Sequence, residues 1–216
     1  ELLSQGETVV GIDNVNGYYD RGLKQARIER LIGHERFTFQ KMDIAHPETV
    51  LPLATKWPKV TGIVHLAAQA GVRYSLTNPE AYVQSNLVGH LNMLEVARAL
   101  PSLKHMVYAS SSSVYGGNTK LPFAVADRVD QPVSLYAATK RADELMSYAY
   151  AHLFRLPSTG LRFFTVYGPW GRPDMSLYIF TRAILAGEPI PLFNHGDMRR
   201  DFTYIDDIVN GIVSAL

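Results

Sequence analysis

Tyr136 and Lys140 stand four residues apart at the start of a predicted helix, in the segment SLYAATKRADELM at residues 134–146. Positions i and i+4 of a helix lie one above the other on the same face. A nearby ammonium group stabilises phenolate over phenol and so prepares a tyrosine to act as a base near neutral pH. The spacing is compatible with an acid–base pair, while a half-buried tyrosine beside a solvated lysine is the plainer interpretation of the two residues alone.

A run of four serines ends a predicted strand in HMVYASSSSVYG, at residues 105–116. Such a run has poor strand propensity, and a hydroxyl beside a phenolate can bind and polarise a substrate hydroxyl. A serine-rich loop can also simply satisfy backbone groups. Because Ser111 precedes Tyr136 and Lys140 in this order, we favour an active site built from these three residues.

Short β-branched runs alternate with longer segments of helical period, which is typical of a parallel sheet covered by helices on both faces. In such α/β sheets, ligands bind at the carboxyl ends of the strands, where the strand order reverses. Polar residues at those ends are therefore candidates for function. Strands are expected at 8–13, 36–44, 61–68, 105–116 and 158–169, and helices at 79–100 and 136–154.

The composition is that of an ordinary globular protein and argues against several classes. The 216 residues carry 21 Lys and Arg against 20 Asp and Glu, without a charged block, so neither nucleic acid nor an anionic membrane is favoured as a partner. The absence of cysteine excludes disulfides and thiolate chemistry. Apolar runs are of strand length, no signal peptide is visible, and the histidines lack ligand-like spacing. We expect a soluble intracellular protein that binds no metal.

Both ends of the sequence look incomplete for a dinucleotide-binding fold. Such a fold opens with a strand and a glycine-rich turn that approaches the pyrophosphate. Here residues 1–10, ELLSQGETVV, look like the end of a first helix followed by the second strand. Residues 199–216, RRDFTYIDDIVNGIVSAL, stop within a predicted helix. We therefore interpret the chain as an internal piece, truncated at both ends.

Five segments, ASSSSVYG, YAATK, HLAAQAGVRYS, RFFTVYGPWGRPDM and RRDFTYIDDI, together resemble the extended short-chain dehydrogenase/reductase family. Within it they look most like the NAD-dependent UDP-glucuronate 4-epimerases. The resemblance implies a doubly wound Rossmann-like sheet, with an NAD-binding domain at 1–165 and the beginning of an interleaved substrate lobe at 166–216. It also implies a cytoplasmic homodimer that pairs the helices at 79–100 and 136–154 as a four-helix bundle. A membrane anchor before residue 1 is left open.

The resemblance assigns the cofactor contacts residue by residue. Asp13 is expected to bind the adenosine ribose hydroxyls, which favours NAD because a 2′-phosphate would meet a carboxylate. Lys140 is expected on the nicotinamide ribose, with Tyr136 as the base and Ser111 sharing its proton network. The remaining expected contacts are Asp43 and Ile44 at the adenine, Leu66, Ala67 and Ala68 along a strand, Asn86, and Phe164 at the nicotinamide.

The reaction that the resemblance implies involves no net redox change. Tyr136 removes the proton of the sugar 4-hydroxyl while hydride passes from C4 to NAD+. The flat 4-keto intermediate then turns over and receives the hydride on its other face. The cofactor carries the hard step, and the protein supplies orientation and the base.

The expected substrate contacts lie mostly after residue 160. Arg172 and Arg200 are candidates for the nucleotide diphosphate, because guanidinium groups match phosphate oxygens. Residues 189–196, PIPLFNHG, look like the strand that flanks the uracil, with Phe193 near the base.

A uronate substrate brings a hazard, because oxidation at C4 gives a β-keto acid that readily loses carbon dioxide. An epimerase must hold the carboxylate still with neutral donors, and we expect Ser112, Ser113 and Thr165 to do so. Sugar nucleotide 4,6-dehydratases carry Asp-Glu just before Val-Tyr-Gly, and UDP-glucuronate decarboxylases carry a Glu. The serines at 112 and 113 favour epimerisation over both.

Two rival interpretations stay open. The first is a 4-epimerase of a neutral UDP-sugar, UDP-glucose or UDP-N-acetylglucosamine, which would be indifferent to replacement of Thr165. The second is a catalytically inactive fragment, which would bind no cofactor. A dehydratase or decarboxylase is disfavoured.

Overall fold

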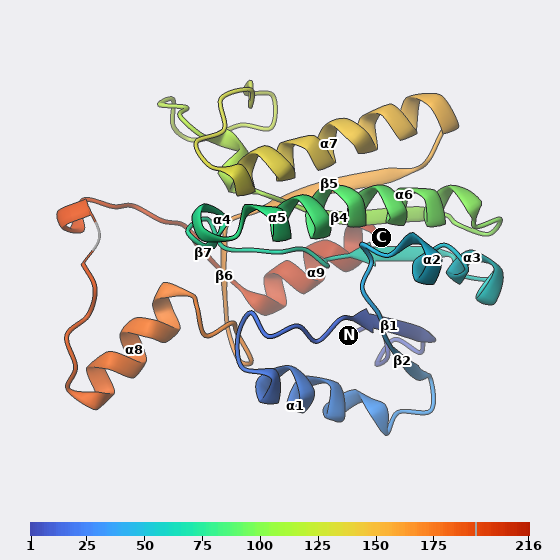
Figure 1. Cartoon of the computed structure of the whole chain (residues 1–216), viewed down its shortest axis with the longest axis horizontal. Helices are drawn as coiled ribbons and strands as arrows, with labels where there is room; N and C mark the ends of the chain where they lie inside the picture. The colour runs from blue at the N-terminus through green and yellow to red at the C-terminus, as the bar shows by residue number, and fades with distance from the viewer. Residues whose placement is uncertain (193) are drawn as a thin grey trace. The chain divides into compact units, whose positions relative to one another are not determined.

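The computed structural model describes residues 1–192 and 194–216, so Phe193 lies outside the described residues. Strands and helices alternate along most of the chain (Figure 1). The strands are β1 (Val9–Asp13), β2 (Phe37–Lys41), β3 (Gly62–His65), β4 (His105–Ser111), β5 (Ser158–Phe163), β6 (Thr165–Tyr167) and β7 (Phe202–Tyr204). The α-helices are α1 (Arg21–Ile32), α2 (Pro47–Val50), α3 (Leu53–Lys56), α4 (Tyr74–Thr77), α5 (Pro79–Tyr82), α6 (Gly89–Ala99), α7 (Leu135–Phe154), α8 (Ser176–Ala186) and α9 (Ile205–Ala215). The π-helix η1 covers Val83–Val88, and the 3₁₀ segments η2 and η3 cover Ser112–Tyr115 and Asn194–Gly196.

All strand pairs among the described residues are parallel, which confirms the predicted α/β class. β1 pairs with β2, β4 lies between β3 and β5, and β6 pairs with β7. These pairs form three separate hydrogen-bonded groups. The strand expected at 158–169 is divided between β5 and β6, with Phe164 at the break.

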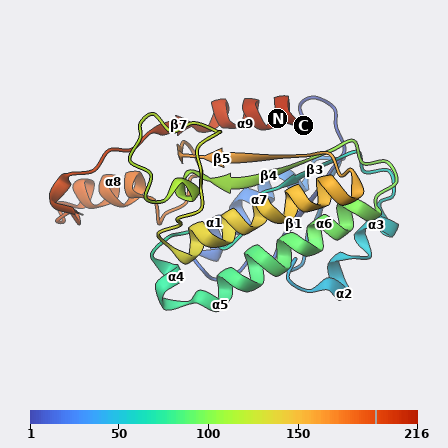
Figure 2. The same cartoon turned by 90° about the horizontal axis from the view of Figure 1, so that it is seen from above.

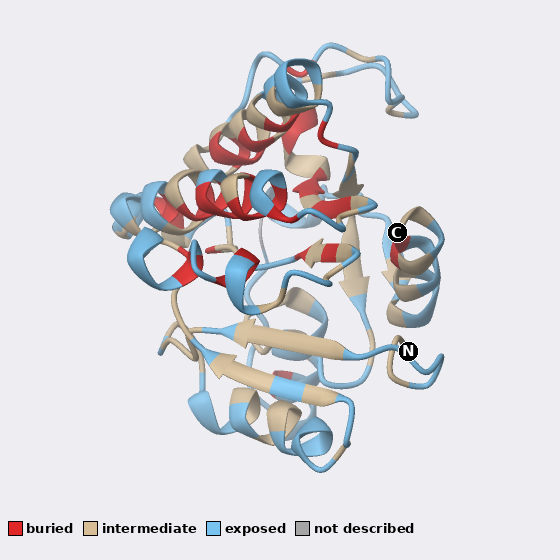
Figure 3. Cartoon of the chain, turned by 90° about the vertical axis from the view of Figure 1, so that its right-hand side faces the viewer, coloured by how far each residue is buried: buried red, intermediate tan, exposed pale blue. Residues whose placement is uncertain are grey.

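The chain divides into two compact units, and each is described by itself. One unit holds residues 1–41 and 164–211, and the other holds residues 42–163 and 212–216. Buried residues concentrate in the second unit and are coloured red in Figure 3. Its core includes Tyr82, Leu94, Met106, Val107 and Val114, each with no more than 2% of its surface exposed.

In the second unit, α7 runs beside the α5–α6 segment (Figures 1 and 2). Ser134 caps the start of α7, because its side chain accepts a hydrogen bond of 3.1 Å from the backbone N–H of Ala137. The helix ends where Arg155 adopts a left-handed conformation with φ of 54°. Between α5 and α6 lies the π-helix η1, and wide turns of this kind are frequent at functional sites. The helix predicted at 79–100 is therefore confirmed, with one irregular segment in it.

Gly160 allows two strands of this unit to pair closely. It lies opposite Tyr108 in the β4–β5 register. A Cβ atom at this position would stand 2.5 Å from the tyrosine ring and hydroxyl. A larger residue here would push the aromatic ring out of the core.

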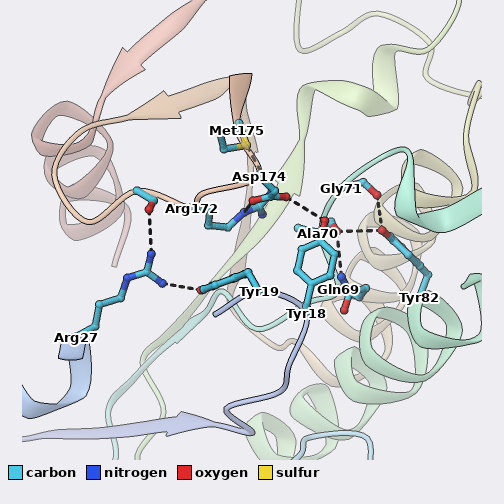
Figure 4. Close-up of polar contacts among 11 residues, drawn as sticks. Tyr18, Tyr19, Arg27, Gln69, Ala70, Gly71, Tyr82, Arg172, Asp174 and Met175 are labelled. Carbon is cyan, nitrogen blue, oxygen red and sulfur yellow. Dashed lines mark hydrogen bonds and ion pairs between the residues drawn. The ribbon is translucent and has the colours of Figure 1, made fainter. Parts of the chain in front are cut away.

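In the first unit, the loop that precedes α8 is tied to α1. Arg27 donates to the Tyr19 hydroxyl at 2.6 Å (Figure 4). It also donates to the carbonyl oxygens of Trp170 at 2.5 Å and Gly171 at 3.2 Å. The guanidinium of Arg30 stacks over the Trp170 ring at 4.9 Å. Trp170 and Gly171 therefore have fixed partners within their own unit.

Two sequence expectations about local structure are wrong. Residues 2–6 form hydrogen-bonded turns rather than the end of a helix. No strand forms over the described part of 189–196, where Pro189 and Pro191 have no backbone N–H to donate and 194–196 make the 3₁₀ segment η3. The predicted C-terminal helix is confirmed as α9.

None of the helices in the described part of the chain combines the length and apolarity needed to cross a bilayer.

Candidate active site

Lys140 is buried, which rules out the interpretation of a solvated lysine. Only 4% of its surface is exposed, and it lies one turn after Tyr136 on α7. Its Nζ donates to the carbonyl oxygen of Ala109 at 3.0 Å and to Oδ2 of Asp143 at 3.1 Å. An ammonium has three donors, so a third N–H is left for a ligand. The lysine is thus fixed between α7 and the end of β4.

Tyr136 packs against a second tyrosine, Tyr82 on α5. The two rings meet edge to face, with centroids 6.1 Å apart and an interplanar angle of 76°. Tyr82 is fully buried, and its hydroxyl donates to the carbonyl oxygens of Ala70, at 2.9 Å, and of Gly71 (Figure 4). The ring beside the candidate base is therefore fastened to the loop that follows β3.

Asn86, in the π-helix η1, fixes the same loop against α7. Its Oδ1 accepts from the backbone N–H of Gln69 at 2.7 Å, and its Nδ2 donates to the Gln69 carbonyl at 3.1 Å and to Oγ1 of Thr139 at 2.9 Å. The side chain is 1% exposed. The sequence predicted a direct cofactor contact for Asn86, and the structure gives it a place within the framework behind the loop. In that loop Leu66 and Ala67 are exposed, and Ala68 is half-buried.

The serine run divides into a structural residue and three candidates. Ser110 is buried and donates to Oε1 of Glu144 at 2.6 Å. Ser111 is also buried, and its Oγ accepts from the backbone N–H of Ser113 at 3.1 Å, which starts the segment η2. Ser112 and Ser113 are half-buried on η2. Ser111 therefore ends β4, and the next two serines follow it on a tight turn.

Glu144 holds this strand end to α7 and β5. Besides Ser110, it accepts from Arg162 at 2.9 and 3.0 Å and from Arg141 at 2.8 Å. These partners lower the pKa of Glu144 against the opposing effect of burial. The arrangement satisfies both carboxylate oxygens and locks the end of β4.

Sequence reasoning missed a buried polar cluster beneath Lys140. The rings of His65 and His90 stack with centroids 5.2 Å apart, and Nε2 of His90 forms a hydrogen bond of 2.9 Å with Oγ of Ser147. Burial, and then the charge of Lys140, lower the pKa of His90 to about 3, and burial also lowers the pKa of His65. Burial raises the pKa of Asp143 to about 6, against the effect of Lys140. Of these residues, only Asp143 could have been found from the sequence, because it stands three residues after Lys140 and so lies on the same side of the helix.

Two adenine-side candidates, Asp43 and Ile44, follow β2. Asp43 is half-buried, and its Oδ1 accepts from the backbone N–H of Ala45 at 2.9 Å. Ile44 is buried, and its carbonyl accepts from Nδ2 of Asn92 at 2.8 Å. The segment is therefore anchored to α6.

Asp13 ends β1 in the other unit with 49% of its side chain exposed. Its Oδ1 accepts from the backbone N–H of Val15 at 2.6 Å, in a turn where Val15 has φ of 51°. Nζ of Lys24 lies 3.9 Å from the same carboxylate, and burial lowers the pKa of this lysine. Lys24 could not be predicted from the sequence, because it stands eleven positions after Asp13 and this separation matches no helix or strand period.

The substrate candidates of this unit differ in their surroundings. Arg172 makes a two-pronged ion pair with Asp174, with Nε and Nη2 each 2.9 Å from a carboxylate oxygen, and Tyr18 donates to the same aspartate at 3.0 Å (Figure 4). Phe164 and Thr165 are half-buried, and Thr165 begins β6. Arg200 is exposed in a segment without regular structure, and the expectation for Phe193 falls outside the described residues.

Within residues 1–192 and 194–216, no three or more His, Asp or Glu side chains lie together in a way that could hold a metal ion.

The family model described as NAD dependent epimerase/dehydratase family matches residues 1–216. The chain is 54% identical over 215 residues to the probable UDP-glucuronate 4-epimerase of Rhizobium meliloti (strain 1021), covering 98% of this chain and 62% of that protein. It is 52% identical over 213 residues to Protein CapI of Staphylococcus aureus, covering 98% and 63%. It is 51% identical over 218 residues to UDP-glucuronate 4-epimerase 4 of Arabidopsis thaliana, covering 100% and 49%. The chain thus spans between about half and just under two thirds of these relatives.

Solved structures give the same picture. The UDP-glucuronic acid 4-epimerase from Bacillus cereus, in complex with UDP-glucuronic acid and NAD, superposes with a TM-score of 0.90 at 34% identity. The match covers 99% of this chain and 66% of that one. A UDP-N-acetylglucosamine 4-epimerase from Methanobrevibacter ruminantium M1 superposes with a TM-score of 0.83 at 28% identity, covering 96% and 64%.

Proposed function

Since this chain belongs to the NAD-dependent epimerase/dehydratase family, we propose that the protein interconverts UDP-glucuronate and UDP-galacturonate by epimerisation at C4. One observation carries the chemistry: the ammonium of Lys140 is buried and held by two acceptors one turn after Tyr136. A lysine placed this way serves the phenol above it. The similarity to UDP-glucuronate 4-epimerases supports the choice of substrate.

NAD fits the residues that are present. Asp13, half-exposed at the end of β1, would hold the adenosine ribose hydroxyls. Ala67, exposed after β3 and with a small side chain, would let NAD approach the backbone, and the third N–H of Lys140 would reach the nicotinamide ribose. When bound, NAD supplies the acceptor that takes a hydride from C4 and returns it to the opposite face. Residues 1–165 would form the NAD-binding domain, and residues 166–216 would begin the substrate lobe.

The protein's own side chains handle the proton and the carboxylate. Tyr136 takes the proton of the 4-hydroxyl, and Ser111 donates a hydrogen bond to the same oxygen. Ser112, Ser113 and Thr165 hold the uronate carboxylate with neutral donors and so oppose decarboxylation. Arg200 and Arg172 bind the diphosphate, the latter by sharing its guanidinium between Asp174 and the phosphate.

A 4-epimerase of a neutral UDP-sugar is the second candidate. The similarity in structure to a UDP-N-acetylglucosamine 4-epimerase supports it. The two candidates differ in the need for donors to a carboxylate, which a neutral sugar lacks.

The test is incubation of the protein with UDP-glucuronate and NAD+, followed by NMR of the anomeric proton. We expect UDP-galacturonate from the wild type and a loss of about a hundredfold or more in Tyr136→Phe, because general base catalysis contributes that much. Tyr178→Phe, on the exposed side of α8, is the matched control and should keep full activity. Conversion of UDP-N-acetylglucosamine alone would favour the second candidate, UDP-pentose would show a decarboxylase, and no turnover with any substrate would contradict an enzyme.

We also propose that the protein is a cytoplasmic homodimer, paired through α6 and α7. Leu145, Tyr148 and Leu153 on α7 are 54%, 75% and 67% exposed, and Leu91 on α6 is 40% exposed. Exposed apolar rows of this kind suit a helix-bundle interface. Sedimentation should give a dimer for the wild type and a monomer for Tyr148→Glu. A monomeric wild type would contradict the interface.

A further inference from the structure

Asp143 is the carboxylate that contacts the candidate catalytic lysine. Its Oδ2 lies 3.1 Å from Nζ of Lys140, one turn earlier on α7, and the two side chains are 1% and 5% exposed. The second acceptor of the ammonium is the carbonyl of Ala109, two residues before Ser111 on β4. The lysine is therefore held between an acid on the helix and the strand that carries the active-site serine.

None of the other ionisable groups described around this pair supplies a negative charge to Lys140 in place of Asp143. His65 on β3 and His90 on α6 are kept neutral, since burial lowers the pKa of both. Burial likewise raises the pKa of Tyr108 on β4, so this phenol carries no charge at neutral pH.

The neighbouring acid, Glu144, faces a different set of partners. Its charge is opposed by Arg141 and Arg162, and its oxygens accept from these side chains and from Ser110. Within the described residues, the negative charge that directly contacts Lys140 is therefore that of Asp143.

Asp143 has one oxygen without a hydrogen-bond partner in the described structure. Its Oδ1 is buried and accepts no hydrogen bond. A buried carboxylate that is only half satisfied costs stability, and this cost is offset where the charge is paired with the buried ammonium of Lys140. An acid at this place is best explained by what it does for the lysine.

We propose that Asp143 is a positioning residue that holds the ammonium of Lys140 against the end of β4, in the place from which the lysine serves Tyr136. Its consequence for turnover rests on the proposed epimerase function, whereas its contact with Lys140 is independent of any substrate. Protonation of Asp143 would remove the negative charge that attracts the ammonium and so weaken its contact with Oδ2. The pKa of Asp143, raised by burial to about 6, places that event just below neutral pH.

The first test reads the lysine directly and needs no turnover. In protein labelled with ¹³C at the lysine ε-carbons, the Lys140 signal, assigned from Lys140→Arg, should shift with pH around a midpoint of about 6. In Asp143→Asn this step should disappear, while in Ser147→Ala, a buried polar control one turn further along α7, it should persist. A wild-type signal without the step, or a step that survives in Asp143→Asn, would overturn the proposal.

The second test is the pH profile of epimerisation. We expect Asp143→Asn to lower kcat by about tenfold to a hundredfold at pH 8, because misplacing a catalytic group by about 1 Å has effects of that size. The wild-type rate should fall below pH about 6, and Asp143→Asn should lose this limb. Ser147→Ala should keep the shape of the wild-type profile. An unchanged profile in Asp143→Asn would overturn the positioning role, whereas absence of turnover in the wild type would count against the proposed function and leave the NMR test to decide.

Discussion

In the unit of residues 42–163 and 212–216, Lys140 and Ser111 are buried and hydrogen-bonded and Tyr136 is half-buried, whereas in the unit of residues 1–41 and 164–211 the candidate ligand contacts are half-buried or exposed. Every buried polar side chain of the described chain lies between residues 65 and 147. In the other unit, Ala183 is the one buried residue among those described. The base, the lysine and the serine are thus set by internal packing, and changes near them should disturb fold and chemistry together.

The largest difference in stability between the two units should come from removing one carboxylate in each, Glu144 in the buried unit and Asp174 in the more exposed one. Glu144→Ala leaves Arg162 without its carboxylate partner at a site where both side chains are less than one fifth exposed. We expect a loss of about 3 kcal/mol in the free energy of unfolding, because breaking a largely buried ion pair strands a charge. Asp174→Ala, which removes the partner of Arg172 in the more exposed pair, should cost at most about 1 kcal/mol. Urea unfolding of both variants measures the difference, and equal losses would contradict the contrast between the units.

Acid should destabilise the buried unit through its neutral histidines. The folded protein keeps His90 unprotonated down to a pKa of about 3, whereas an unfolded chain protonates it near 6.5. The unfolded state therefore binds more protons in this window, and stability falls as the pH drops below 6.5. At about 1.4 kcal/mol per pH unit, the wild type should lose about 2 kcal/mol more than His90→Gln between pH 7 and pH 5.

The control for this titration is internal. His65 acts in the same direction, and Asp143, with its raised pKa, acts in the opposite one, but both are present in wild type and variant. Their contributions cancel in the comparison. Parallel stability curves for the two proteins would show that His90 does not carry the acid sensitivity.

The sequence predicted the part of the site that depends on local spacing. Tyr136 and Lys140 share a helix face because they are four residues apart, and Ser134 marks the start of that helix. The resemblance to a known family added roles for Ser111 and Asp13. Each of these inferences depends only on the spacing within one helix or strand and on the order of the elements along the chain.

What the sequence could not predict depends on packing between elements. Alternation along a strand puts Ser110 and Ser111 on opposite faces, but which face meets α7 is decided by the helix position. Ser110 consequently bonds to Glu144, and Ser111 begins the turn η2 of the candidate site. The stacked histidines come from β3 and α6, and no spacing along the chain brings them together.

Replacement of Thr165 probes the less buried unit for its role in recognising a uronate. Thr165→Val keeps the shape of the side chain and removes its hydroxyl. We expect KM for UDP-glucuronate to rise about tenfold, which corresponds to about 1.4 kcal/mol for one hydrogen bond to a charged group, with stability nearly unchanged. Thr203→Val, on the paired strand β7, is the matched control and should leave KM as it is. An unchanged KM in Thr165→Val would favour a neutral sugar as substrate.

The smallest effect should come from the turn after β1, where Val15 adopts φ of 51°. A β-branched residue is strained in this left-handed region, while asparagine tolerates it. Val15→Asn should therefore raise the free energy of unfolding by up to about 1 kcal/mol, because the strain is relieved and the hydrogen bond from its N–H to Asp13 remains. Val125→Asn, at a position that is 86% exposed, is the control and should have no effect. If the affinity for NAD+ falls in Val15→Asn although stability rises, the strained valine holds the Asp13 carboxylate for the ribose. If the affinity for NAD+ and the free energy of unfolding are both unchanged, the turn at Val15 is not strained and contributes neither to stability nor to cofactor binding.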